Sequence, residues 1–323
     1  MTKRIMVKSK NVKTVNDARE QYLYECKIRN LAPSTIENYI ENLKFFFELI
    51  GEETLCQEIQ EETMMDFILF LQEKYENKMT VVTRLKAIRS FIYFCQSKGW
   101  IQKFEIKLPK VEQKIKETYT EDELKRLLKK PTWNSYGAWR NWAMVSFLLG
   151  TGCRVTTCIN IKISDVDFKN NMIMYSTTKN KKQQLIPLSK ALKQVLDLYL
   201  SKWEHKEEDY LFCDSYGRQL TDDNFKRIIQ RYNNSRGVSK TSSHMFRHTF
   251  AKNWILNGGD VFRLQKILGH SSMDMVRKYV NMFSTDLQDN FDSFNPLDKM
   301  QNNIKHIDVV RKSNVKNNHT REL

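Results

Sequence analysis

The sequence predicts a mainly helical protein with a small β-sheet, divided into a helical amino-terminal domain and a mixed α+β domain. Apolar residues recur at helical spacing through most of residues 14–100, and short runs of strand character lie between residues 165 and 188. The length of 323 residues and the 41% hydrophobic content suffice for two cores. We expect a helical domain at 12–100, a linker at 101–118, a mixed α+β domain at 119–300 and a flexible basic tail at 301–323.

The amino-terminal domain is expected to contain four helices. The first spans about Val15–Ile28, and the second begins at a predicted capping box, Ser34–Glu37, just after Pro33. Helical spacing of apolar residues predicts a third helix over Thr63–Leu71 and a fourth over Val81–Cys95. The aromatic residues of these helices are interpreted as core rather than as a platform for stacked bases. They are Phe45, Phe46, Phe47, Phe91, Tyr93 and Phe94.

The second domain is expected to begin with another capping box, Thr120-Glu121-Asp122-Glu123, after a linker rich in Lys and Glu. Two helices, three short strands and four further helices should follow. The expected helices are 121–130, 136–149, 190–203, 222–234, 244–256 and 260–268, and the expected strands are Asp165–Phe168, Met172–Tyr175 and Gln184–Leu188. Gly150 to Gly152 are interpreted as a turn before a helix that carries Arg154.

The charge of the chain indicates a polyanionic partner, since the formal net charge is +15. Residues 168–196 carry six Lys, residues 224–259 carry seven Lys or Arg, and neither stretch contains an Asp or Glu. A solvated surface normally mixes both signs, so acid-free stretches favour contact with phosphates. We therefore expect the partner to be a nucleic acid.

Several other classes of protein find no support in the sequence. No apolar run approaches the roughly 18 residues of a membrane span, and the first twenty residues lack the apolar segment of a secretory signal. We therefore expect a cytoplasmic protein without a membrane partner. The six cysteines include no C-x-x-C pair, so reduced, buried thiols are expected rather than a zinc site or a redox pair.

A tyrosine, two arginines and two histidines form the candidate site. Tyr279 follows His270 by nine residues, while His244 and Arg247 are three apart and would share one face of a helix. A tyrosine hydroxyl has a pKa of roughly 10, so a tyrosine nucleophile needs positive neighbours or a proton acceptor. Arg154 and Arg247 can each hold phosphoryl oxygens through paired hydrogen bonds. His244 and His270 are suited to orienting phosphate and moving the tyrosine proton.

The order and spacing of these motifs matter more than any one of them. Along the chain come Thr-Gly-Cys-Arg ending at Arg154, a lysine-bearing hairpin ending in Ile186-Pro187-Leu188, His-Met-Phe-Arg-His-Thr-Phe-Ala from His244, Leu-Gly-His-Ser-Ser around His270, and then Tyr279. This arrangement resembles the tyrosine recombinase family, which includes phage integrases and Xer-like proteins. The resemblance implies that the helical domain is a core-binding domain, which clamps a duplex together with the catalytic domain.

The resemblance extends over about residues 14–295 and implies a role for each site residue. Lys179 is the implied hairpin lysine because it lies seven residues before Ile186, and Lys181 and Lys182 are less favoured substitutes. It is a candidate acid for the departing 5′ oxygen. The implied catalytic residues are Arg154, Lys179, His244, Arg247, His270 and the nucleophile Tyr279.

Two positions depart from the simplest expectation. Three residues after the first arginine the family usually has an acidic residue, whereas this chain has Thr157, which can accept a hydrogen bond but supplies no charge. His248 lies four residues after His244, a spacing that suits a metal site on a helix. Arg247 lies between them and no carboxylate accompanies them, so His248 is interpreted as a core or supporting histidine.

The implied function is site-specific recombination or integration of DNA, as in mobile elements, through a 3′-phosphotyrosyl intermediate and without a metal or other cofactor. The expected partners are double-stranded DNA with specific recombination sites, three further copies of the chain in a homotetramer on synapsed DNA, and accessory DNA-bending or directionality proteins. The expected location is the nucleoid in the cytoplasm. Two alternatives stay open: a type IB topoisomerase-like nicking-closing enzyme, and a non-catalytic DNA-binding protein on the same scaffold.

An apolar stripe at helical spacing follows the tyrosine and consists of Phe283, Leu287, Phe291 and Phe294. Such a stripe needs a partner surface. It can pack on its own domain, or, as the resemblance implies, form a helix that is donated to a neighbouring protomer so that four subunits close a ring.

Overall fold

The structure, a computed structural model, consists of two compact units whose boundary falls between residues 114 and 115. Each unit has its own hydrophobic core. The structure describes residues 13–111, 116–132, 135–176, 183–270, 272–283 and 297. Within these ranges no helix is both long enough and apolar enough to cross a membrane.

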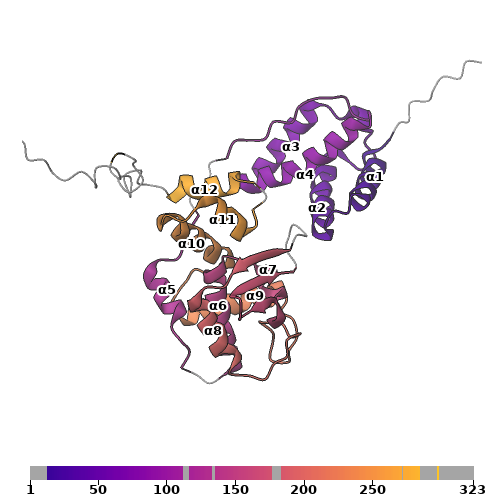
Figure 1. Cartoon of the computed structure of the whole chain (residues 1–323). Coiled ribbons are helices and arrows are strands. Elements are labelled where there is room, and N and C mark those ends of the chain that lie inside the picture. The colour runs from indigo at the N-terminus through magenta and orange to yellow at the C-terminus, as the bar shows by residue number, and fades with distance from the viewer. Residues whose placement is uncertain are drawn as a thin grey trace, which may run out of the picture. The chain divides into compact units, whose positions relative to one another are not determined.

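The first unit is a helical domain in which the last helix packs against the three before it (Figure 1). Its elements are α1 (Val15–Ile28), α2 (Pro33–Ile50), the 3-10 turn η1 (Cys56–Glu58), α3 (Glu61–Lys74) and α4 (Lys78–Ser97). Phe46, Phe67 and Phe91 are completely buried, and the ring centroids of Phe46 and Phe67 lie 5.0 Å apart in an edge-on contact. The aromatic residues therefore form core as expected, although Tyr93 is 39% exposed.

The start of α2 differs from the prediction. The helix begins at Pro33 with Ala32 as its N-cap, no side chain caps it, and Ser34 lies inside the first turn. Proline suits this position because the first helical N–H has no partner within the helix and the ring fixes φ near its helical value. The predicted capping box at Ser34 is therefore wrong. The box at Thr120 is present, since its hydroxyl accepts from the Glu123 N–H and the Glu123 carboxylate accepts from the Thr120 N–H.

The first half of the expected linker packs into the core of the first unit. Ile101 and Ile106 are both 3% exposed, and the Ile106 N–H donates to the Tyr93 hydroxyl at 3.2 Å. An extended segment with irregularly placed apolar residues gives no periodic signal, which is why the sequence did not reveal this packing. The chain divides further on, between residues 114 and 115.

The second unit is built around a central helix, α6, that is apolar around most of its circumference and therefore buried. The elements are α5 (Glu121–Leu128), α6 (Tyr136–Thr151), α7 (Val155–Asn160), the 3-10 turn η2 (Ile163–Asp165), β1 (Val166–Asp167), β2 (Met172–Tyr175), β3 (Gln184–Pro187), α8 (Lys190–Leu200), α9 (Asp222–Ser235), α10 (Ser243–Leu256), α11 (Val261–Leu268) and α12 (Asp274–Phe283). Helix α6 packs against α5, α8, α9 and α10. Helices α10, α11 and α12 lie together at one end of this unit (Figure 1).

The three strands form one antiparallel sheet in the order β1-β2-β3. Ile173 of β2 lies opposite Ile186 of β3, and both are buried, whereas the neighbouring Met174 and Leu185 are exposed. This alternation is the period of two that a half-buried strand requires. The β2–β3 connection carries Lys179, which lies outside the described residues, as do Lys181 and Lys182.

Some elements of the second unit differ in extent from the prediction. Helix α8 ends at Leu200 rather than at residue 203. Asp165 belongs to η2 rather than to the first strand, and its carboxylate accepts from the Lys162 N–H at 2.9 Å. The separate helix α12 was not predicted as an element, although six of its ten residues are apolar.

Candidate active site

The turn that carries Arg154 depends on a glycine. Helix α6 ends at Thr151, and Gly152 follows in the left-handed conformation with φ of +61°. A Cβ atom at Gly152 would lie 2.7 Å from Cδ1 of Phe250 and 2.8 Å from Cδ2 of Leu268, so both the conformation and the space exclude a larger residue. Arg154 is the N-cap of α7 rather than a residue within a helix, which corrects the prediction.

Arg247 holds three segments of the second unit together. It lies on α10, and its side chain donates through Nη1 to the Gly152 carbonyl at 2.9 Å and through Nη2 to the Leu268 carbonyl at 2.8 Å. Nη2 also lies 2.6 Å from Nε2 of His270. Burial and the charge of Arg154 lower the pKa of Arg247 to about 10. The guanidinium therefore remains charged at neutral pH although it is buried.

His270 is positioned as a hydrogen-bond donor. Arginine has no acceptor, so Nε2 of His270 must accept from Arg247, and in the neutral ring the proton then sits on Nδ1. That Nδ1 atom is buried and has no hydrogen-bond partner among the described groups. Burial and the charges of Arg247 and Arg154 lower the pKa of His270 to about 4. The imidazole is therefore neutral at neutral pH and presents an N–H.

The Tyr279 hydroxyl lies 2.8 Å from Nδ1 of His248. Tyr279 is on α12 and only 8% exposed, whereas His248 is on α10 directly after Arg247. Burial raises the pKa of Tyr279 above its usual value, while Arg247 and Arg154 lower it. The sequence interpretation of His248 as a core or supporting residue missed this contact. The position of His248 directly after Arg247 was the one sign in the sequence that it lies near the site. The spacing of residues within α10 cannot reveal a partner on α12.

The other predicted residues surround the same point. His244 lies in the first turn of α10, and burial together with the charges of Arg247 and Arg154 lowers its pKa. The ring centroids of His270 and Tyr279 are 6.1 Å apart and the rings are parallel. The fold thus brings together Arg154, His244, Arg247, His270 and Tyr279. Lys179 cannot be placed among them because it lies outside the described residues.

Two other tyrosines of the second unit are poor candidates for the nucleophile. The Tyr232 hydroxyl donates to the Leu127 carbonyl at 2.7 Å. Tyr175 is 4% exposed, and burial raises its pKa well above the usual value. Tyr279 is buried to a similar degree, but its hydroxyl lies beside a histidine nitrogen and within the field of Arg154 and Arg247.

Arg154 has no protein group to order its guanidinium in the described part of the chain. Thr157 is buried on α7, and no hydrogen bond joins it to Arg154. Arg154 is only half-buried, and burial lowers its pKa. Thr157 therefore does not replace the acidic residue that the resemblance would place here.

Gln184 connects the sheet to the segment that carries His270. Its Nε2 donates to the carbonyls of Lys266 and Ile267 near the end of α11, at 2.8 Å for Ile267. Gly269 follows with φ of +61°, and a Cβ atom there would lie 2.7 Å from Oε1 of Gln184. A glutamine on a strand gave no signal in the sequence, because the contact joins residues 82 and 83 positions apart.

The described residues contain no group of three or more His, Cys, Asp or Glu side chains placed to bind a metal ion. Nδ1 of His248 faces the Tyr279 hydroxyl. All six cysteines are free and buried, in agreement with the sequence prediction.

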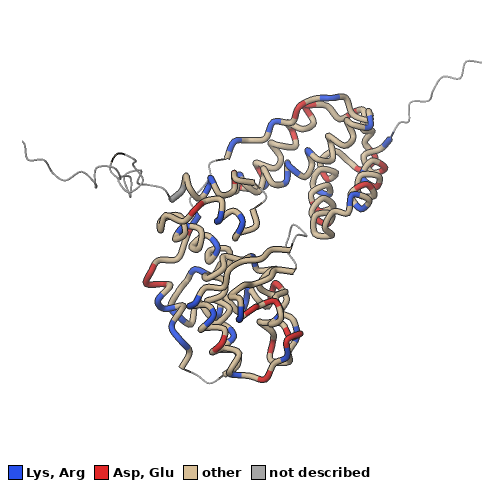
Figure 2. The backbone as a smooth tube through the Cα atoms, in the orientation of Figure 1, with Lys and Arg blue, Asp and Glu red and all other residues tan. Residues whose placement is uncertain are grey.

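Basic residues occur throughout both units (Figure 2). Two of those in the acid-free stretch 224–259 nevertheless pair with acids outside it. Lys226 forms ion pairs with Asp222 and Asp223 at the start of α9. Lys240 bonds to the Glu123 carboxylate at 2.9 Å and to the Thr118 carbonyl at 3.0 Å. Lys240 is therefore a structural contact as well as a positive charge, which a linear count of charges could not show.

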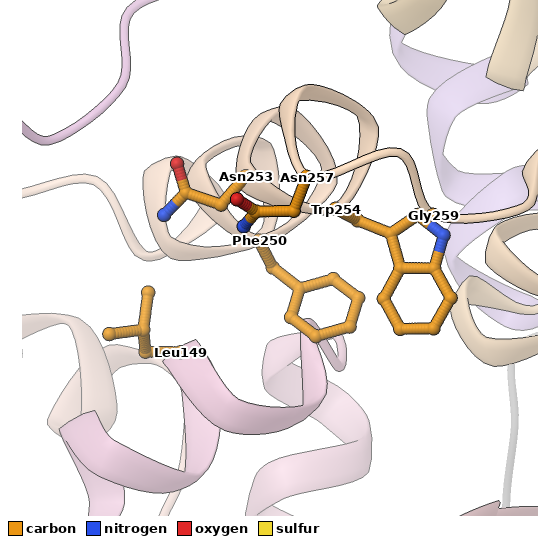
Figure 3. Close-up of a pocket in the computed structure, with 6 residues that line it drawn as sticks. All are labelled: Leu149, Phe250, Asn253, Trp254, Asn257 and Gly259. Atoms are coloured by element: carbon orange, nitrogen blue, oxygen red, sulfur yellow. The ribbon is translucent and has the colours of Figure 1, made fainter. Parts of the chain in front are cut away.

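A pocket of about 400 Å³ lies beside α10 (Figure 3). Leu149, Phe250, Asn253, Trp254, Asn257 and Gly259 line it. None of these side chains is titratable. The charged groups of the candidate site do not line this pocket.

His248 and His270 predict a pH dependence of stability. His248 and His270 have pKa values lowered from 6.5 to about 4 in the folded protein, chiefly by burial. The unfolded chain therefore binds more protons between these values, so the free energy of unfolding should fall as pH drops from 6.5 to 4. Urea unfolding of the protein at several pH values gives the free energy of unfolding as a function of pH. The slope of that dependence should be shallower for the double variant His248→Asn/His270→Gln. An unchanged slope would contradict the assignment.

Comparisons with known proteins agree with the motifs and the geometry. A model of the Phage integrase family matches residues 117–285. Tyrosine recombinase XerC from Anoxybacillus flavithermus is 30% identical over 268 residues, covering 79% of this chain and 89% of the relative. Tyrosine recombinase XerD from Oceanobacillus iheyensis is 27% identical over 293 residues, covering 86% of this chain and 98% of the relative.

Solved structures share the fold. The Tn1549 transposon integrase in complex with transposon right end DNA aligns with a TM-score of 0.71 at 18% identity, covering 86% of this chain and 96% of that one. The XerH site-specific recombinase bound to its palindromic difH substrate aligns with a TM-score of 0.66 at 22% identity, covering 82% of each chain. The chain therefore belongs to the phage integrase family and is a site-specific recombinase of the tyrosine class.

Proposed function

We propose that the protein cuts and rejoins double-stranded DNA at specific sites through a covalent 3′-phosphotyrosyl intermediate, with Tyr279 as the nucleophile. The observation that carries this proposal is the position of the Tyr279 hydroxyl beside a histidine nitrogen and within the field of Arg154 and Arg247. A phenol, a proton acceptor and two permanent positive charges are what attack on a phosphodiester requires.

In the proposed cleavage reaction, each site residue has a defined role. Oη of Tyr279 gives its proton to a histidine nitrogen and attacks phosphorus, the Oη–P bond forms, the P–O5′ bond breaks, and the 5′ oxygen leaves with a proton. Arg154 and Arg247 hold the non-bridging oxygens, whose negative charge grows in the transition state. The Nδ1–H of His270 and the nearby His244 orient the phosphate, and Lys179 supplies the proton to the leaving oxygen. Because the phosphotyrosyl ester retains the energy of the phosphodiester, rejoining needs neither ATP nor a metal ion.

The type IB topoisomerase-like alternative shares this chemistry but differs in the DNA that it selects. Covalent capture on fragmented, nicked DNA, followed by denaturation and sequencing of the DNA ends linked to the protein, separates the two. A recombinase should give a few related sequences, and two copies of such a sequence should exchange strands in EDTA. Attachment scattered over unrelated sequences, with relaxation of any supercoiled plasmid, would favour the topoisomerase. Affinity without any covalent product would favour the non-catalytic protein.

The protein is proposed to work in the cytoplasm, on the nucleoid, as a homotetramer that holds two recombination sites together. Accessory DNA-bending or directionality proteins would set the outcome. The support for the tetramer is the apolar stripe after the nucleophile, in which Leu287, Phe291 and Phe294, together with the side chain of Phe283, lie outside the described residues. A helix with one apolar face needs a partner surface, and donation to a neighbouring protomer closes a ring.

Truncation after Met282 is expected to leave monomer folding and binding to a single site largely intact while abolishing synapsis and strand exchange. Val276 and Tyr279 of α12, which the truncation retains, belong to the described core of the second unit. Sedimentation and gel-shift measurements decide the result. Normal tetrameric synapses would contradict donation of the stripe, and an unfolded monomer would indicate that it packs on its own domain.

A further inference from the structure

The site contains three histidines, and they differ in what their ring nitrogens face. Nδ1 of His248 lies 2.8 Å from the Tyr279 hydroxyl. Nε2 of His270 accepts from Arg247, which leaves that ring with a proton on Nδ1 and no free acceptor. His270 is therefore suited to donate to a phosphate, whereas His248 is suited to accept from the nucleophile.

The contact between His248 and Tyr279 is held by packing on both sides. Val276 and Tyr279 of α12 pack with Ala251 of α10 and Leu264 of α11 in one buried cluster. Thus α12 is fixed against the helix that carries His248. The tyrosine and histidine rings are 5.6 Å apart at an angle of 49°, which allows a hydrogen bond in place of stacking.

We infer that His248 is the general base of strand cleavage, a role that rests on the proposed function of Tyr279. As Oη attacks phosphorus, the Oη–H bond breaks and the proton moves to Nδ1 of His248. The Oη–P bond forms, the P–O5′ bond breaks, and a general acid protonates the 5′ oxygen. On rejoining, the imidazolium returns its proton to Oη as the 5′ hydroxyl displaces the tyrosine.

The electrostatic surroundings keep this base available. Burial and the charges of Lys116, His244 and Arg247 lower the pKa of His248 to about 4, so the ring is unprotonated at neutral pH. Those same charges would make His248 a weak base on its own. The phosphodiester brings a negative charge into the site, which favours the imidazolium and offsets the neighbouring cations.

The test compares His248→Asn with His248→Ala in single-turnover cleavage of a nicked suicide substrate. The Oδ1 atom of asparagine can take the place of Nδ1 and accept the hydrogen bond, but it cannot hold a proton. Both variants should bind DNA normally and cleave about 10²–10⁴-fold more slowly, the usual contribution of general base catalysis. His205→Ala is the matched control and should cleave normally, since that exposed histidine bonds only to the Trp203 carbonyl in the described structure.

Two further measurements separate proton transfer from mere positioning. Added imidazole should restore part of the cleavage by His248→Ala. A fluorinated tyrosine at position 279, whose hydroxyl is more acidic, should reduce the loss caused by His248→Asn. Cleavage by His248→Asn at close to the wild-type rate would overturn the inference, because a hydrogen-bond acceptor alone would then suffice. Absence of any adduct with the wild-type protein would instead contradict the proposed function.

Discussion

The Tyr279→Phe variant is expected to bind its DNA site with near-normal affinity and to form no covalent protein–DNA adduct. The substitution removes one oxygen and no charge, and the ring can keep its place in the cluster with Val276 and Leu264. The hydrogen bond to His248 is lost, which should change stability by only about 0.5–1.5 kcal/mol. Gel shift measures binding, and a denaturing gel after incubation with a nicked suicide substrate measures the adduct.

Tyr232→Phe is the matched control for this experiment. It also removes one phenolic oxygen from a buried tyrosine, but the lost bond is to the Leu127 carbonyl, in the core rather than in the site. This variant should form the adduct normally. An adduct with Tyr279→Phe, or its loss with Tyr232→Phe alone, would move the nucleophile elsewhere.

Arg154→Ala should slow cleavage by about 10²–10³-fold, the usual result of losing one preorganised donor to a developing negative charge. Its stability should change little, because the Arg154 side chain has no hydrogen-bonded partner among the described residues and is only half-buried. Single-turnover cleavage under saturating protein measures the first effect, and urea unfolding measures the second. Full cleavage by Arg154→Ala would contradict its role.

Arg247→Ala should slow cleavage at least as much and should also destabilise the protein. The carbonyls of Gly152 and Leu268 lose their donor, at a cost of about 1–3 kcal/mol for each buried group left unpaired. The two arginines therefore separate catalysis from structure. Lys226→Ala is a useful comparison, since that lysine is exposed, pairs with Asp222, and should leave both cleavage and stability nearly unchanged.

Local patterns in the sequence predicted most of the fold. Helical spacing and the Thr120 cap correctly located helices such as α5, α6 and α9, and period-two alternation located β2 and β3. The predicted start of α2 was wrong. Ser34 begins a sequence typical of a capping box, but Pro33 occupies the first helical position and sets the boundary. The burial of Ile106 depends on contacts with another part of the chain, which periodicity does not report.

The sequence likewise predicted some features of the candidate site and missed others. Motif order selected Arg154, His244, Arg247, His270 and Tyr279, and the fold brings them together. Which histidine faces the nucleophile was not accessible, because the hydrogen bond from Tyr279 to His248 joins residues 31 positions apart on separate helices. The bonds of Gln184 to the end of α11 were missed for the same reason.

The most direct test of the account is to identify the residue that becomes linked to DNA. The purified protein would be incubated in excess EDTA with a nicked suicide substrate built from a captured site, then digested and examined by mass spectrometry. The account predicts a 3′-phosphate ester on Tyr279 of α12, formed without added metal. Attachment to Tyr175 or Tyr232, or cleavage that needs Mg²⁺ or Zn²⁺ and leaves no protein on the DNA, would contradict it.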